Sequence, residues 1–112
     1  MAIEVGTTRQ ALANTYTGLG DWFSMHTGAT SGTGANEATG GGYLRKQTVW
    51  GTGANGVKSG SQMAFDLLAA TYNRVGFWNA ATVGTFLDSA AMTSTALPVD
   101  GQILVTPTVT VT

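Results

Sequence analysis

The sequence predicts an all-β fold: a single-domain antiparallel β-sandwich, jelly-roll-like or immunoglobulin-like, with a short helix near the N-terminus. Three observations support this prediction. The 16 glycines disfavour helices, because glycine is costly in a helix interior. Several short stretches alternate apolar and polar residues, which is the pattern of a strand with one buried face. Turn-forming residues separate these stretches, and six or more short strands joined by turns are typical of a sandwich.

Composition restricts the classes of function. The 112 residues suit one domain over residues 1–112, with a single core. Only 10% of the residues are charged and the net charge is -1, so the clustered Lys and Arg that bind nucleic acid are missing. Cysteine is absent, which excludes disulfides and thiolate metal sites. With neither a secretory signal nor a run of about 20 apolar residues, we expect a soluble protein made in the cytoplasm and no membrane span.

The N-terminal segment 1–19 is expected to form an arm or a short helix. Residues 7–17 place Ala and Leu at helical spacing, with Thr7 or Thr8 as the N-cap. The run DWFSMH at 21–26 is then expected to be a strand. One face would hold Trp22, Ser24 and His26, and the other Phe23 and Met25.

Four further stretches of the middle of the chain are expected to be strands. Residues 43–50 and 61–67 alternate, and 72–78 forms the next strand. The segment NAATVG at 79–84 is expected to close a hairpin into 85–87, because Asn and Gly tolerate the positive φ of tight turns.

Two segments are expected at the surface. The stretch 28–42 is too rich in glycine to pack and predicts a Gly-rich surface loop. The C-terminal segment 102–112 predicts a strand with threonines on one face, and Pro107, which has no N–H, places it at a sheet edge or splits it in two. The apolar face of this strand holds Ile103, Val105, Val109 and Val111.

A glycine pattern near the middle of the chain satisfies the dinucleotide-binding spacing G-x-G-x-x-G. Gly51, Gly53 and Gly56 follow a predicted strand, which is one half of the required context. The other half is a helix that offers its N-terminus to a phosphate, and the sequence that follows predicts none. We therefore interpret the pattern as a glycine turn.

The single histidine is the next candidate for chemistry. His26 shares a predicted strand face with Ser24, and Asp21 lies close by in sequence. Alternation on a strand spaces residues i and i+2 by about 7 Å, beyond the reach that a nucleophile and its base require. We therefore expect a structural histidine and no catalytic residues.

The charged residues give no site either. The six acidic residues stand singly in different predicted elements, without the paired carboxylates of glycoside hydrolysis or a calcium-binding spacing. Arg45 and Lys46 are the only adjacent basic pair and are expected on a solvated strand face. Together with the missing cysteines, these observations predict no metal site, no cofactor and no enzymatic activity. The acidic residues are Glu4, Asp21, Glu37, Asp66, Asp88 and Asp100.

Large side chains are the remaining candidates for contact with a partner. Aromatic residues fill cores or anchor interfaces, and Trp and Tyr are enriched at binding hot spots. An uncharged strand at a sheet edge also invites pairing with a neighbour. The candidate interface or ligand contacts are Trp50, Trp78, Tyr43, Val109 and Val111.

Three stretches resemble a family of small tail-fibre-like proteins, also called minor tail or decoration proteins, of actinobacterial (mycobacteriophage-type) tailed phages. They are WFSMHTG at 22–28, TGANEATGGGYLRKQTVWG at 33–51 and VGFWNAATVGTFL at 75–87, and the resemblance covers roughly residues 20–92. It implies a structural β-sandwich protein of the virion, assembled in the host cytoplasm, without a cofactor or catalytic residues.

Two functions follow as hypotheses. The first is a non-enzymatic structural protein that docks on other virion subunits, as a capsid decoration or minor tail protein, and forms homo-oligomers. The second is a tail-fibre-type binding module that recognises a glycan of the host cell surface. A chain of 112 residues without a coiled coil or fibrous repeat fits coverage of a lattice better than reach toward a receptor, which favours the first.

Overall fold

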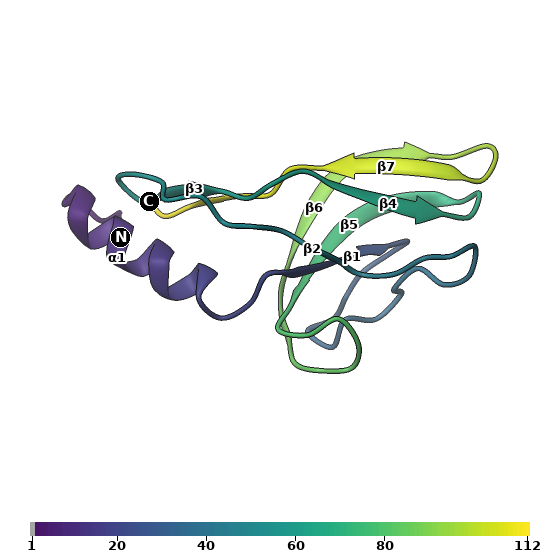
Figure 1. Cartoon of the computed structure of the whole chain (residues 1–112), viewed down its shortest axis with the longest axis horizontal. Coiled ribbons are helices and arrows are strands. Elements are labelled where there is room, and N and C mark those ends of the chain that lie inside the picture. Colours follow the sequence, from purple (N-terminus) through teal and green to yellow (C-terminus); the bar gives the residue numbers. More distant parts are fainter. Residues whose placement is uncertain (1) are drawn as a thin grey trace.

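The computed structural model describes residues 2–112, which form an elongated molecule of 46 × 25 × 24 Å with the helix at one end (Figure 1). The elements are antiparallel strands preceded by one helix, as predicted. They are α1 (Gly6–Thr17), β1 (Trp22–His26), β2 (Lys46–Gln47), β3 (Val57–Ser59), β4 (Met63–Leu67), β5 (Thr71–Trp78), β6 (Phe86–Ala96), β7 (Gly101–Val105) and β8 (Thr108–Thr110).

The helix α1 is fixed by tertiary contacts. Val5 stands at the N-cap and makes no side-chain cap, so the prediction of Thr7 or Thr8 at this position is wrong. The side chain of Arg9 instead donates to the carbonyl of Asn55, which ties the first turns of α1 to the loop before β3. The helix contacts β3 and β8 and thereby covers the end of the sheet layers.

One layer of the fold is a four-stranded antiparallel sheet in the order β2-β1-β5-β6. In the β1–β5 ladder, Phe23 pairs with Phe77 on the core face, whereas Ser24 pairs with Gly76 on the opposite, outer face. The alternation predicted for 21–26 is confirmed, but both faces of β1 are buried. Another segment of the chain must therefore cover the outer face of the sheet.

The second layer is a long two-stranded ribbon. The β4–β7 and β3–β8 pairs lie end to end, and between them three residues of one strand oppose two of the other. Pro107 lies at this irregularity, where its missing N–H breaks no ladder and its carbonyl accepts from the N–H of Gly60. Both alternatives for segment 102–112 hold, because the strand divides at Pro107 and each part pairs with a single neighbouring strand.

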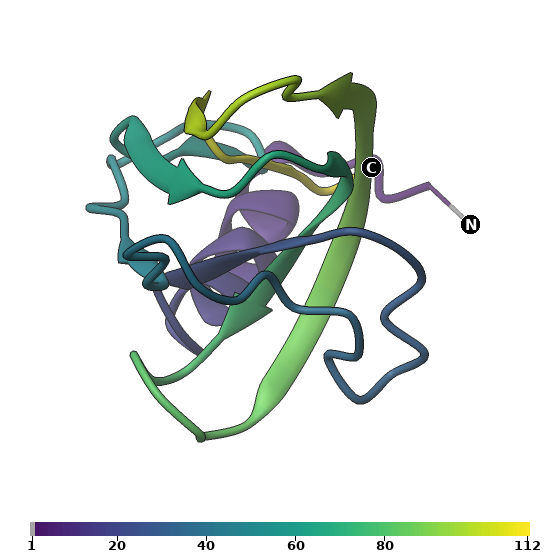
Figure 2. The ribbon, with the colours of Figure 1, turned by 90° about the vertical axis from the view of Figure 1, so that its right-hand side faces the viewer.

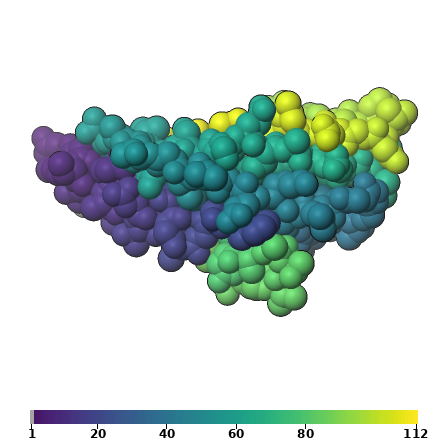
Figure 3. Space-filling view, in the orientation of Figure 1, coloured from purple at the N-terminus to yellow at the C-terminus, as the bar shows by residue number. Residues whose placement is uncertain are grey.

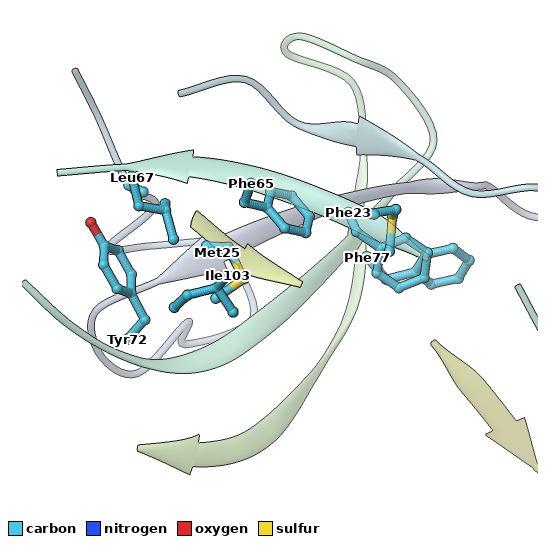
Figure 4. Close-up of a cluster of buried hydrophobic side chains, with 9 residues drawn as sticks. Phe23, Met25, Phe65, Leu67, Tyr72, Phe77 and Ile103 are labelled. Atoms are coloured by element: carbon cyan, nitrogen blue, oxygen red, sulfur yellow. The ribbon is translucent and has the colours of Figure 1, made fainter. Parts of the chain in front are cut away.

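The hydrophobic core lies between the two layers. Phe23, Met25 and Phe77 of the sheet face Phe65 and Ile103 of the ribbon (Figure 4). Viewed along the long axis, the layers enclose one interior, with α1 beyond it (Figure 2). The predicted all-β sandwich with a short N-terminal helix is thus confirmed.

Two strand predictions differ from the structure in length. The strand expected at 43–50 shrinks to β2, and Leu44 and Val49 are exposed, because β2 pairs with only two residues of β1. In the other direction, the strand expected at 85–87 continues as β6 to Ala96. Alanine and serine residues favour a strand weakly, and it is pairing with β5 that makes this segment extended.

The Gly-rich stretch 28–42 packs more closely than its composition predicts. Thr30 and Ala38 are buried, and the N–H of Ala38 donates to the carbonyl of Met25. Thr30 Oγ1 also lies 2.9 Å from Ser89 Oγ on β6. The expectation that this segment cannot pack is therefore wrong: it helps to cover the outer face of the main sheet.

Candidate functional site

A buried polar network lies on the outer face of the main sheet, centred on Ser24 and His26 of β1. The Oγ of Ser24 lies 2.6 Å from Nε2 of His26, and the indole N–H of Trp78 donates to Ser24 Oγ at 2.7 Å. Nδ1 of His26 lies 2.8 Å from the carbonyl of Ala35, which only accepts, so Nδ1 carries the proton. Ser24 then donates to Nε2, and every polar atom of the chain Trp78–Ser24–His26–Ala35 has a partner.

The expected separation of Ser24 and His26 was wrong, because it used the spacing of the backbone and neglected the convergence of two side chains on one face. Gly76 makes this convergence possible: a Cβ at this position would lie 2.3 Å from Ser24 Oγ and 2.6 Å from His26 Nε2. Ser24 and His26 nevertheless have no exposed surface. A nucleophile and base must reach a substrate, so this pair holds the sheet and the 28–42 segment together.

An ion pair extends the network. Arg45 forms a two-pronged contact with Glu37, with Nε to Oε2 and Nη2 to Oε1 both at 2.9 Å. Its guanidinium also lies 3.5 Å from the ring centroid of Trp78, a cation–π contact. The prediction that Arg45 lies on a solvated strand face is therefore wrong, since its side chain is only 9% exposed.

The ionisation of the network follows from its burial. Burial lowers the pKa of His26 below its ordinary value, so the imidazole is neutral at pH 7. Burial acts to raise the pKa of Glu37, but hydrogen bonds from Arg45 and Tyr43 outweigh it and hold the pKa below its ordinary value. Burial and the hydrogen bond to Glu37 raise the pKa of Tyr43.

The same arginine holds the hairpin loop between β5 and β6. Nη1 of Arg45 donates to the carbonyls of Ala80 and Val83, at 3.1 and 2.8 Å. Val83 has φ = 56°, a left-handed conformation that is a rare outlier for a β-branched residue. The loop 79–85 projects from the body as the green lobe of Figure 3. The predicted hairpin is confirmed, with a strained valine that its sequence did not reveal.

A second feature is an open hollow between α1, β6 and the segment 105–111, which we call the apolar groove. Its deeper end is a pocket of about 240 Å³ that reaches the core aromatics Phe23, Trp50 and Phe77. Its outer part is lined by Leu12 and Leu19 together with residues 108–111. The residues common to both parts are Tyr16, Asp88, Ala90, Thr108 and Val109.

The groove is chemically simple. Asp88 is the one charged residue that lines it in the described part of the chain, and its carboxylate already accepts a hydrogen bond from the Tyr16 hydroxyl at 2.5 Å. Burial and this hydrogen bond raise the pKa of Tyr16. Leu19 remains 52% exposed beside it. The groove therefore presents apolar surface to solvent with its main charge engaged internally.

The structure places the five predicted contact residues in different environments. Val109 and Val111 lie in the apolar groove, half-buried, and Trp50 lines the deeper pocket from the core side. Trp78 is only 7% exposed, and Tyr43 is half-buried in the ion-pair network. The fold thus brings Val109, Val111 and Trp50 together at the groove. Trp78 and Tyr43 belong instead to the network on the outer face.

Sequence reasoning missed the residues that complete the groove. Leu12 and Leu19 were assigned to no surface, and the strand predicted at 85–87 ended before Asp88 and Ala90, which β6 supplies. The available signal was Leu12, an apolar residue on a short helix whose buried face consists of Ala13 and Thr17 instead. An amphipathic helix normally buries such a leucine, but Leu12 is 46% exposed at the groove.

Residues 2–112 contain neither a cluster of metal-binding side chains nor a membrane-spanning helix. No three or more His, Asp or Glu side chains of the described chain gather in a way that would hold a metal ion. None of its helices is long and apolar enough to cross a membrane.

The fold and the groove define a class: a small antiparallel β-sandwich that offers apolar surface for contact and closes its polar network to solvent. Residues 8–112 match the model of the family described as podophage GP4 fiber I protein gp80, and the chain belongs to this family. No curated protein and no solved structure matches the chain. The protein is therefore a phage tail-fibre-type structural protein and a component of the virion.

The family match also decides part of the resemblance found in the sequence. The phage and tail-fibre character is confirmed, and it implies association with other virion proteins. The actinobacterial origin has no support from a podophage family and stays a prediction.

Proposed function

We propose that this protein is a non-enzymatic subunit of a tail fibre that docks on other virion subunits, copies of itself included, through the apolar groove. The observation that carries the proposal is the exposure of Leu12 and Leu19, at 46% and 52%, beside the half-buried Val109 and Val111. Apolar surface gathered around a hollow marks an interaction site on a soluble protein. Assembly from subunits made in the host cytoplasm belongs to the same proposal.

The strand edges at the groove support it further. β6 is the outermost strand of the main sheet, and β8 pairs with β3 alone, so backbone groups of both are open to a partner. Exposed edges with few charges accept a further strand or a flat apolar surface. β6 carries one charged residue, Asp88, in 11 positions.

The proposed location is the tail, and the match to a family described as a fibre protein supports it. A capsid decoration protein would use the same kind of surface, so the distinction is made by copy number and position in the particle. The alternative of a glycan-binding module required tryptophans as open stacking platforms. Trp78 is 7% exposed beneath Arg45, and the indole N–H of Trp50 donates to the carbonyl of Gly20, so we give priority to docking.

The experiment is incorporation of variants into phage particles. Leu12→Asp places a charge in the groove, and Ala11→Asp is the matched control, because Ala11 is exposed on the same helix and does not line the groove. Phage lacking the wild-type gene are grown in cells that supply each variant, and purified particles are assayed for the protein.

We expect both variants to fold, as judged by circular dichroism, and only Ala11→Asp to be incorporated. Incorporation of Leu12→Asp at the wild-type level would refute docking through the groove. Loss of both variants from the particles would refute it equally, because the effect would then not depend on the groove.

A further inference from the structure

We infer that the hairpin loop 79–85 of one copy inserts Val83 into the deep pocket of the apolar groove of a second copy, so that subunits join head to tail. This inference rests on the proposed function and names the partner and the contact that the groove would use. Three observations carry it: the conformation of the loop, the chemistry of the pocket, and the placement of the two features on one chain.

The loop presents its valine at a conformational cost. Val83 is 84% exposed, more than any other large hydrophobic residue that the structure describes. Its φ of 56° is one that Gly or Asn would adopt with less strain. Strained residues persist where the surrounding structure over-determines them, and they gather at functional contacts. Here the carbonyl of Val83 accepts a hydrogen bond from the largely buried Arg45, which fixes the strained conformation.

The rest of the loop is equally well fixed. The Oδ1 of Asn79 accepts from the N–H of Thr85 at 2.8 Å, which closes the base of the hairpin. Gly84 beside the valine adopts φ = 69°. A preorganised apolar tip loses little conformational freedom on binding, which favours affinity.

The pocket suits an uncharged aliphatic side chain. Its volume of about 240 Å³ exceeds the roughly 150 Å³ of a cavity known to hold benzene, so a valine side chain with part of its loop fits. The walls include Phe77, Val105 and Val109, and the Asp88 carboxylate at the rim is engaged by Tyr16. The segment 79–87 carries no charged residue, so insertion would bury no unpaired charge.

The placement of the two features makes the contact intermolecular. No residue of the loop 79–85 lines the pocket of its own chain, and the high exposure of Val83 shows that its own fold leaves it free. A knob on one surface that fits a pocket on a different surface of the same molecule forms a heterologous contact. Such contacts produce rings when the rotation closes and filaments when it does not.

The test uses the full chain and two complementary variants. Val83→Asn removes the apolar knob and suits a positive φ, whereas Ala90→Trp fills the groove from β6 and leaves the loop intact. Val49→Asn is the matched control, because Val49 is 75% exposed and lies outside both the loop and the groove. Sedimentation velocity over a concentration series gives the stoichiometry, and denaturant unfolding verifies the fold of each variant.

We expect the wild type and Val49→Asn to form assemblies of three or more copies, and each of the other variants to be monomeric. An equimolar mixture of Val83→Asn and Ala90→Trp should form dimers and nothing larger, because one offers only a free pocket and the other only a free knob. This mixture distinguishes a specific contact from a general loss of solubility or folding.

Other outcomes overturn the inference in distinguishable ways. Assembly of Val83→Asn at wild-type affinity would show that Val83 does not make the contact. If Ala90→Trp is then monomeric, docking through the groove still holds, with a different occupant. Assembly of both variants at wild-type affinity would show that self-association does not use the groove either. A wild type that remains monomeric at all concentrations, or stops at a dimer, refutes head-to-tail joining. Docking on other virion subunits is tested independently, by the incorporation of Leu12→Asp into particles.

Discussion

At the scale of single residues, the network around His26 combines buried polar groups that are each satisfied by a specific partner. An unsatisfied buried donor or acceptor costs about 1–3 kcal/mol, so this network favours one arrangement of the sheet and the 28–42 segment over others. Two predictions concern this network directly.

The first prediction concerns pH. His26 is neutral in the folded protein because burial lowers its pKa below 6.5, whereas the unfolded chain takes up a proton as the pH falls through that value. The unfolded state then binds more protons, so the free energy of unfolding should decrease as the pH is lowered from 7.5 to 5, by at most about 1.4 kcal/mol per pH unit. Urea unfolding at a series of pH values measures this slope.

The control for this prediction is His26→Gln, which should be less stable at pH 7.5 and should lose the slope between pH 7.5 and 5. Glu37 contributes in a separate range, because its lowered pKa makes its stabilisation disappear only as the pH falls below its ordinary value of 4.5. A slope above pH 5 that persists in His26→Gln would contradict the assignment.

The second prediction concerns Gly76. Gly76→Ala would place a methyl group against Ser24 Oγ and His26 Nε2, and we expect a loss of about 1–3 kcal/mol, as for an overpacked core. Gly101→Ala is the matched control in a strand, because its nearest contact for a Cβ is 3.9 Å away. Equal urea midpoints for the two variants would show that the close approach at Gly76 is not needed.

At the scale of elements, the structure depends on segments being held by residues outside them. Arg45 joins the 28–42 segment, through Glu37, to the hairpin loop, through the carbonyls of Ala80 and Val83. Short loops with these fixed connections open less readily than their sequence alone would suggest.

This arrangement yields a third prediction. Arg45→Lys keeps the charge but loses the planar two-pronged contact with Glu37, so we expect a loss of about 2 kcal/mol, less than for complete removal of a buried partner. Amide exchange of Asn79 and Thr85 at the base of the loop should accelerate. Lys46→Gln is the neighbouring control and should leave both quantities unchanged; unaltered exchange in Arg45→Lys would contradict the bracing role.

Elements with strong local patterns were predictable from the sequence. β1 and β4 alternate clearly, and the Asn and Gly of the 79–84 turn mark a hairpin. Only the start of β6 was predicted, at 85–87, because its later Ala, Ser and Thr residues carry little apolar alternation and only the ladder with β5 makes them a strand. The burial of Thr30 and Ala38 escaped for a similar reason, since tertiary contacts and not composition decide how a glycine-rich segment packs.

At the scale of the whole molecule, the apolar groove lies between the helix and the two layers. Part of it was predictable, because the alternation of Val109 and Val111 indicated an apolar strand face, and both residues lie in the groove. Leu12 and Ala90 come from elements 78 positions apart in the sequence, and no local pattern brings them together. The positive φ of Val83 could not be predicted either, because the sequence Thr-Val-Gly does not determine which of its residues adopts a left-handed conformation.

The fourth prediction concerns the virion and the proposal that this β-sandwich is a subunit of the tail fibre. Quantitative mass spectrometry of purified particles gives its copy number relative to the major capsid protein and to a tail protein of known multiplicity. We expect a copy number far below that of the capsid protein and equal to a small multiple of that of the tail protein. A copy number that tracks the capsid lattice, retained in particles stripped of their tails, would contradict it.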